Sequence, residues 1–158
     1  AGIFVEASAG NAGPACSTVD DGPALFGEAF SVGAIDANGK LAGFSSRGPV
    51  TVDGSGRMKP DLVAPGVRVR SCLPGNRYGS LSGTSMAGPH VVGVIALLWS
   101  ARPELSRQIA ATKALLLASS VPAVTLGFPE LCGGVSSDFV PNNSFGAGRV
   151  DALAAITW

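Results

Sequence analysis

The stretch SGTSMAGPHVVGVIALLWSA, residues 82–101, carries the strongest structural and chemical signal in the sequence. From Ser85 to Ala101, apolar residues occupy nearly every side of a helix, which predicts a helix buried in the middle of a domain. Ser85 stands among small residues at the start, where the positive end of the helix dipole would lie near its hydroxyl oxygen. Such a serine suits a nucleophile for acyl transfer, and the alternative is a helix N-cap with small neighbours for packing.

Short apolar runs precede this helix, and further helical patterns follow it. Residues 1–5 have the pattern of a strand already under way, so we expect the sequence to begin inside a domain. We expect strands at residues 3–7, 30–35, 62–64, 67–71 and 78–82, helices from about residue 106 and over residues 150–156, and turns over residues 127–148. Short strands followed by long helices indicate α/β layering.

The composition indicates a globular domain with a substantial core and few surface charges. The 158 residues include 11 Lys plus Arg and 11 Asp plus Glu, so the net charge is zero and no basic surplus indicates nucleic-acid binding. Hydrophobic residues make up 46% of the chain, enough to bury a core. The longest apolar stretch, residues 91–99, is well short of the ~20 residues that span a membrane. We therefore expect neither a nucleic acid nor a membrane as partner.

A second chemical signal follows the first predicted strand, in the sequence ASAGNAGP at residues 7–14. The side-chain N–H of an asparagine at the end of a strand can donate a hydrogen bond to an oxyanion that develops during acyl transfer. Asn11 stands at such a position, and the alternative is an ordinary asparagine in a turn.

His90 is the only histidine, and we do not expect it to act as a base for Ser85. The nucleophile elbow has the pattern G-x-S-x-G with its acid and histidine later in the chain, and Ala87 stands where the second glycine belongs. His90 follows Ser85 at a spacing that is roughly 140° around a helix axis, so its imidazole should point away from the serine. A structural role is expected for His90.

Five segments, taken together and in order, resemble the subtilisin-like serine proteases, or subtilases. They are the asparagine segment 8–11, the loop 45–49, the segment 59–66, the serine segment 83–90 and the helix entry 145–152. The resemblance extends from Ile3 to about Ile156. It implies a three-layer α/β fold with a mostly parallel sheet and a buried central helix that starts at the nucleophile. Residues 1–158 would be the C-terminal portion of a single subtilisin-like peptidase domain, and so an incomplete part of this fold.

The resemblance also implies a role for each matching residue. Ser85 would be the nucleophile, and Asn11 would donate to the oxyanion together with the backbone N–H of Ser85. Ser8, Ala9 and Gly10 would line one wall of the pocket for the substrate residue before the scissile bond. The implied activity is that of a serine endopeptidase, which hydrolyses protein or peptide substrates through an acyl-enzyme.

The sequence departs from the family in one respect, because the subtilase Asp and His precede the serine and no histidine occurs before Ser85. The resemblance therefore implies that both groups lie outside this sequence, in the N-terminal half of the catalytic domain. That half would be a partner of this chain, and the chain alone would be inactive. The alternative is a catalytically inactive subtilase-fold module for binding or scaffolding.

Three cysteines, Cys16, Cys72 and Cys132, have no zinc-site spacing. One disulfide and one free thiol can form, and the spacing does not choose among the three pairings. The resemblance points to Cys16 with Cys132, because Gly-Pro-x-Cys and Cys-Gly-Gly look like a pair in related secreted subtilases. Cys72 would then be free, and its alternating strand predicts a small core residue. The bridge would imply an oxidising, extracellular location for a secreted protein.

Three carboxylates attract attention, but we assign none of them a chemical role. Glu6 could stand in for the missing base, yet a carboxylate that lies at the sheet edge or faces solvent is expected. Asp20 and Asp21 could bind calcium, yet adjacent carboxylates point apart and are usually solvated. We expect no cofactor to be required for catalysis, and structural calcium is not assigned to any residue.

Overall fold

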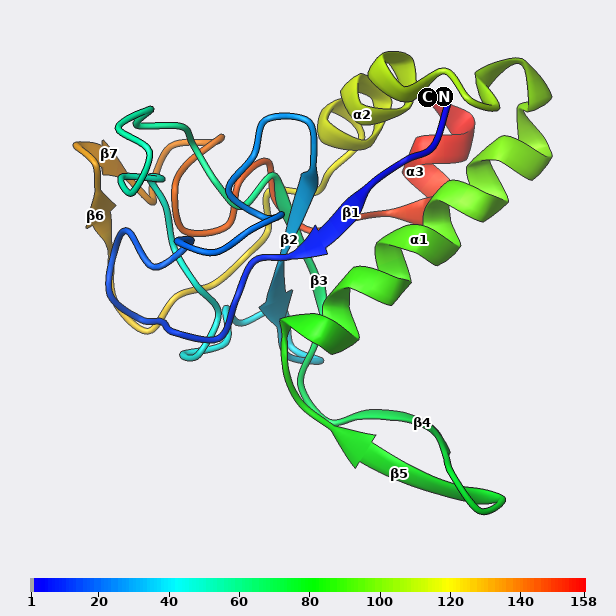
Figure 1. Ribbon diagram of the computed structural model, residues 1–158, viewed down its shortest axis with the longest axis horizontal. Coiled ribbons are helices and arrows are strands. Elements are labelled where there is room, and N and C mark those ends of the chain that lie inside the picture. The colour runs from blue at the N-terminus through cyan, green and yellow to red at the C-terminus, as the bar shows by residue number, and fades with distance from the viewer. Residues whose placement is uncertain (1) are drawn as a thin grey trace.

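Three parallel strands form the central sheet of the computed structural model, which describes residues 2–158 (Figure 1). The strands β1 (Glu6–Ser8), β2 (Phe30–Ile35) and β3 (Leu62–Pro65) are ordered β1-β2-β3. Both neighbouring pairs are parallel, so the carboxyl ends of all three strands lie at one edge of the sheet. This edge is where parallel sheets commonly place a functional site.

The sequence predicted β2 correctly and β1 only in part. The apolar run 30–35 is β2 itself, whereas the strand expected at 3–7 is observed as β1, which starts three residues later and ends one residue later. The N–H of Phe30, the first residue of β2, donates to the carbonyl of Val5 at 2.8 Å, so pairing with β2 begins just before β1. Ala1, part of the strand expected over residues 1–5, lies outside the described residues.

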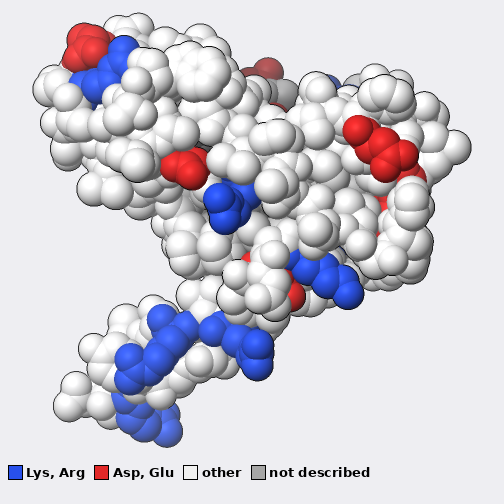
Figure 2. Space-filling view, turned by 180° about the vertical axis from the view of Figure 1, so that it is seen from behind, with Lys and Arg blue, Asp and Glu red and all other residues white. Residues whose placement is uncertain are grey.

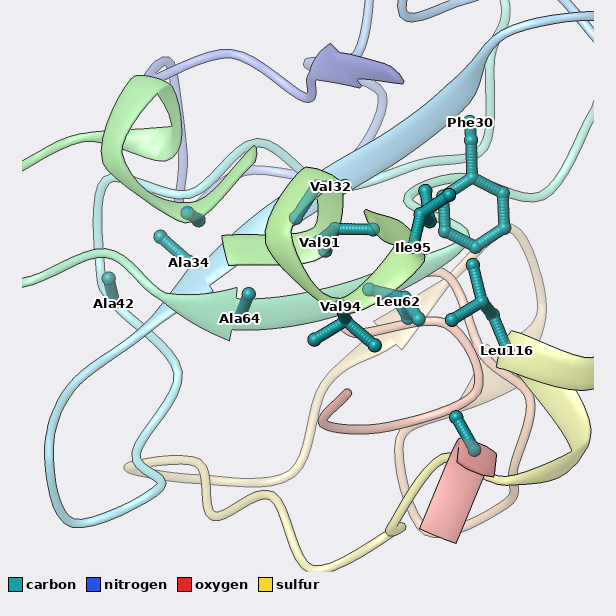
Figure 3. Packing of buried hydrophobic residues seen from close by; sticks show 12 residues of the cluster. Phe30, Val32, Ala34, Ala42, Leu62, Ala64, Val91, Val94, Ile95 and Leu116 are labelled. Carbon is teal, nitrogen blue, oxygen red and sulfur yellow. The ribbon is translucent and has the colours of Figure 1, made fainter. Parts of the chain in front are cut away.

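The long helix α1 (Thr84–Ala101) lies across one face of the sheet and begins one residue before the predicted helix. Figure 3 shows its buried side chains over β2 and β3. Full burial of each large apolar side chain stabilises the fold by about 1.5–3 kcal/mol. Side chains at the centre of this core include Phe30, Val32, Leu62, Val91 and Ile95.

The opposite face of α1 is not covered within residues 2–158. Val92 is 51% exposed and Leu97 is 56% exposed. By length and composition alone α1 could also cross a membrane, but its other face packs on the sheet and on α3 (Ala152–Thr157). In the described part of the chain, α1 is therefore a core helix on one side only.

A two-stranded hairpin projects from the body below the start of α1 (Figure 1). Its strands are β4 (Val69–Leu73) and β5 (Arg77–Leu81), which start two residues later and one residue earlier than predicted. Cys72 lies on β4 opposite Tyr78 and is exposed, so the expectation of a core cysteine was wrong. A strand of an isolated hairpin has no second layer to bury its side chains, which explains the difference.

The remaining elements differ most from the expected pattern. A 3₁₀ turn (Pro103–Leu105) separates α1 from α2 (Ile109–Ala118), so the second helix starts about three residues later than expected. Within the stretch expected to be turns lies a short hairpin of β6 (Leu131–Cys132) and β7 (Val135–Ser136). Its strands contain two residues each, too few for period-two alternation to show in the sequence.

Glu6 on β1 points toward α1 and is half-buried, which corrects the expectation of a solvent-facing carboxylate. A Cβ atom added to Gly88 would clash with the Glu6 carboxyl group where it now lies, so this glycine leaves room for the carboxyl group. Oε1 is buried and has no hydrogen-bond partner among the described residues. Burial raises the pKa of the Glu6 carboxyl above its ordinary value of 4.5.

We expect Glu6→Gln to raise the free energy of unfolding at pH 7. Above the ordinary carboxyl pKa the unfolded chain releases a proton that folded Glu6 still holds, so stability falls as pH rises through the raised pKa. The glutamine cannot titrate, so the gain in the free energy of unfolding over the natural protein should vanish below about pH 4. There Glu6 is protonated in both the folded and the unfolded state. Urea unfolding from pH 3.5 to 8 measures this, with exposed Glu28→Gln as the control. An advantage independent of pH would contradict it.

A disulfide between Cys16 and Cys132 links the loop after β1 to β6, across 116 residues of sequence. This is the pairing that the subtilase resemblance implied. Beside it, Arg47 and Glu130 form an ion pair at 3.1 Å, with side chains only 3% and 11% exposed. The Arg47 backbone N–H also donates to Thr18 Oγ1, at 2.9 Å. The disulfide and the ion pair together hold three distant loops against one another.

We expect replacement of the disulfide by serines at Cys16 and Cys132 to lower the free energy of unfolding by up to about 4–5 kcal/mol. Chain entropy gives this upper figure for a closed loop of such length. Urea unfolding of the double variant measures it, and Cys72→Ser is the matched control because that thiol is free. Peptide mapping without reduction provides a direct check. Alkylation of all three cysteines in unreduced protein would contradict the bridge.

Candidate active site

Ser85, the predicted nucleophile, is exposed and is the second residue of α1. The first backbone N–H groups of a helix have no partner within the helix. Here the N–H of Met86 donates to the carbonyl of Gly83 at 3.0 Å, and the N–H of Thr84 donates to a side chain. Among residues 2–158, no acceptor is found for the N–H of Ser85, which leaves it available to a ligand.

Thr84 brings Asn11 to this helix terminus. Its backbone N–H donates to Asn11 Oδ1 at 2.9 Å, and its hydroxyl donates to the same oxygen at 3.1 Å. A backbone N–H can only donate, so the atom that faces it must be the carbonyl oxygen of the amide. The amide nitrogen Nδ2 of Asn11 is then left free to donate elsewhere.

Asn11 also lies beside the backbone of the serine segment. A Cβ atom added to Gly83 would lie 3.7 Å from both Asn11 Nδ2 and Asn11 Oδ1. The side-chain amide and the start of α1 are therefore neighbours, although 74 residues separate Asn11 from Ser85 in the sequence. The structure thus brings together the two residues that the sequence singled out for acyl-transfer chemistry.

The wall segment Ser8, Ala9 and Gly10 leads from β1 to Asn11. Ser8 and Gly10 are half-buried, whereas the side chain of Ala9 is buried on the other face of the sheet. Ala9 can therefore face a ligand in this site only through its backbone. Gly10 has a φ of +105°, a conformation that a side chain would strain, and an added Cβ atom would lie 2.8 Å from Ser46 Oγ.

Two residues that the sequence analysis assigned no role hold this segment in place. The hydroxyl of Thr84 accepts a hydrogen bond from the N–H of Gly10 at 3.3 Å. Ser46 donates its N–H to the carbonyl of Gly10 at 3.0 Å and accepts the N–H of Ala12 at 3.1 Å. The sequence offered one sign of a role for Thr84, namely a polar residue between a glycine and the candidate nucleophile. Its hydrogen-bond partner Asn11 could be identified only from the fold.

A cavity of about 350 Å³ adjoins the serine. Its walls are residues 69–71 of β4 and, from α1, Ser85, Met86, Pro89 and His90. His90 thus borders the same cavity as Ser85, although the two residues lie on different sides of the helix. The cavity extends around the helix surface from one residue to the other. The ring nitrogen Nδ1 of His90 lies 2.9 Å from the carbonyl of Met86 and must carry the proton there. No hydrogen bond between Ser85 and His90 is found in the described chain.

No residue is assigned to a metal ion. In the described range 2–158, no three His, Cys, Asp or Glu side chains form a group that could hold one. Asp21 accepts the backbone N–H of Gly22 at 2.8 Å, and Asp20 is exposed.

Comparisons with known proteins identify the family of the chain. The model of the subtilase family matches residues 1–148. Bacillopeptidase F of Bacillus subtilis is 40% identical over 99% of this chain, which covers 10% of that protein. Subtilisin E of Bacillus subtilis is 44% identical over 65% of this chain, which corresponds to 25% of that protein.

Solved structures show the same likeness in three dimensions. The prenylagaramide maturation protease PagA aligns with a TM-score of 0.74 at 29% identity, over 99% of this chain and 50% of its own. A mutant of the protease domain of PatA aligns with a TM-score of 0.66 at 28% identity, over 95% of this chain and 46% of its own. The sequence thus spans half or less of these relatives. With its parallel sheet, its central helix and the family match over nearly its whole length, the chain belongs to the subtilase family of peptidases.

Proposed function

We propose that the protein containing this chain is a serine endopeptidase in which Ser85 is the nucleophile. The arrangement around Thr84 carries the proposal, because Thr84 occupies Asn11 Oδ1 with two donors and leaves Asn11 Nδ2 and the N–H of Ser85 free. Two free N–H groups beside one serine suit the oxyanion of a tetrahedral intermediate. Membership of the subtilase family supports the same chemistry.

In this mechanism Ser85 Oγ attacks the carbonyl carbon of the scissile peptide bond and passes its proton to a base. The carbonyl oxygen becomes an oxyanion, which accepts hydrogen bonds from Asn11 Nδ2 and from the N–H of Ser85. The base then protonates the leaving amine, and an acyl-enzyme remains on Ser85. Water activated by the same base releases the acid and restores the serine.

The base is proposed to be a histidine, oriented by an aspartate, in the N-terminal half of the catalytic domain outside this chain. Two features support a place for that half here. β1 is the edge strand of the sheet, and the uncovered face of α1 exposes Val92 and Leu97. Large apolar side chains that remain exposed on a core helix favour a protein surface packed against them.

The wall formed by Ser8 and Gly10 supports a peptide as substrate. Both residues have small or absent side chains and precede Asn11, so a substrate side chain next to the scissile bond has room beside them. The disulfide between Cys16 and Cys132 supports an extracellular location for a secreted enzyme, because such bridges persist in oxidising compartments.

The alternative is an inactive subtilase-fold module that binds or scaffolds. It is favoured by the lack of a histidine before Ser85 and by the hydrogen bond that already engages Nδ1 of His90. Under this alternative Ser85 would have no activating base even in the full-length protein, so the reactivity of Ser85 distinguishes the two functions.

A fluorophosphonate probe tests that reactivity. We expect the full-length protein to be labelled at Ser85, and we expect no labelling of the Ser85→Ala variant or of residues 1–158 alone, because a serine without a base is a weak nucleophile. Mass spectrometry of the labelled peptide identifies the site. An unlabelled full-length protein would exclude the peptidase, whereas rapid labelling of the isolated chain would reveal a base within it.

Asn11 and Thr84 should differ in how strongly they affect turnover. We expect Asn11→Leu to lower kcat much more than it changes KM, as in subtilisin itself, where loss of such a donor costs roughly 10²–10³ in kcat. Thr84→Val loses the hydroxyl that donates to Asn11 and accepts the N–H of Gly10, and should lower kcat about three- to tenfold. Thr84→Ser is the matched control and should retain activity. A change confined to KM in Asn11→Leu would contradict the assignment.

A further inference from the structure

The hairpin of β4 and β5 concentrates positive charge beside the candidate active site. Arg68, Arg70 and Arg77 are exposed on it or at its base, and none of them forms an ion pair among the described residues. No Asp or Glu occurs over residues 62–103. Figure 2 shows the result as a basic surface along the projecting hairpin. The chain as a whole has zero net charge, so this surface is a local surplus of positive charge. The proposed acyl-transfer mechanism assigns no role to it.

This basic surface is continuous with the cavity that Ser85 borders. Arg70 lines that cavity from β4, and Ser85 lines it from α1. The Arg70 guanidinium carbon also lies 4.5 Å from the centre of the Tyr78 ring across the hairpin. Such a cation–π contact restricts the long side chain and leaves its N–H groups accessible. A positive group therefore stands at the edge of the cavity next to the proposed nucleophile.

The hairpin and the wall segment approach Ser85 from different elements. Ser8, Gly10 and Asn11 reach the serine from the end of β1, whereas the hairpin projects below the start of α1, away from β1 (Figure 1). If the acyl part of a peptide lies against the wall segment, the part that leaves as an amine extends toward the hairpin. The charge would then act on residues that follow the scissile bond.

We propose that Arg70 and Arg77 make the enzyme select peptide substrates with Asp or Glu in the first few positions after the scissile bond. This inference rests on the proposed endopeptidase function and adds its substrate class. Guanidinium groups bind carboxylates through paired N–H donors, which suits them to this role. Because both arginines are exposed, each should favour an acidic over a neutral residue only about two- to fivefold.

The test compares three peptides that differ only after the scissile bond, with acidic, neutral amide or lysine residues there. We expect the full-length protein at low salt to cleave the acidic peptide with a kcat/KM about fivefold or more above that of the neutral one. The lysine peptide should be the poorest substrate. In 1 M NaCl the Debye length falls to about 3 Å, and the acidic preference should approach one.

Variants identify the residues responsible. Arg70→Glu with Arg77→Glu should reverse the order of the acidic and lysine peptides, and the single Arg→Gln variants should each remove part of the preference. Arg102→Glu is the control, because Arg102 follows the far end of α1, and it should leave the preference unchanged. An acidic preference that persists in the double variant, or that is absent from the natural protein, overturns the inference.

A binding measurement separates this inference from the proposed function. Full-length protein with Ser85→Ala should bind the fluorescent acidic peptide about fivefold more tightly than the neutral one by anisotropy, with no need for turnover. Failure of all cleavage would exclude the peptidase, whereas equal binding of the two peptides overturns the acidic preference. Arg70→Gln could instead lose binding to phosphatidylserine vesicles while its peptide binding stays unchanged. That result would assign the hairpin to a membrane surface and would also overturn the acidic preference.

Discussion

The hydrogen bonds from Thr84 to Asn11 are the contact on which the candidate site depends. They join the carboxyl end of β1 to the first residue of α1, and they use both the backbone N–H and the hydroxyl of one buried threonine. Without them the Asn11 amide could rotate, and either its oxygen or its nitrogen could face a ligand. With them the oxygen is occupied, and two N–H groups on different elements remain free beside Ser85. The two hydrogen bonds from Thr84 thus determine that the site presents hydrogen-bond donors rather than an acceptor.

The loop that carries Asn11 is also held from the side away from α1. Ser46 contacts this loop through its backbone and its hydroxyl, and the neighbouring Arg47 is buried against Glu130. Breaking a buried ion pair by removing one partner is far more costly than losing an exposed one, because a desolvated charge is left without compensation. Ser144 also donates to Glu130 at 2.6 Å, which satisfies the carboxylate further. The loop that carries Asn11 is therefore fixed between a helix terminus and a buried polar network.

Local patterns in the sequence predicted the parts of the fold that local forces determine. The apolar run of β2 and the long apolar helix α1 emerged within a residue of their observed bounds. Properties that depend on distant packing were not predictable in this way. Cys72 was expected in the core and is exposed, whereas the Glu6 carboxyl group was expected to face solvent and has a buried oxygen. The exposure of each side chain depends on which layer covers its strand. Ser85 and Asn11 were singled out by their local sequences and given roles by resemblance to a family, whereas the role of Thr84 is a contact across 73 residues that no local pattern contains.

The disulfide has a consequence for the proposed peptidase, which would be exposed to its own activity. The turn of the projecting hairpin, between Leu73 and Arg77, is an accessible place for a backbone cut. Such a cut falls inside the loop that Cys16 and Cys132 close, so the two pieces remain one covalent molecule. Asn11 then lies on one piece and Ser85 on the other, yet neither can diffuse away. Autolysis at this turn would leave a nicked protein in which both halves of the oxyanion site stay together.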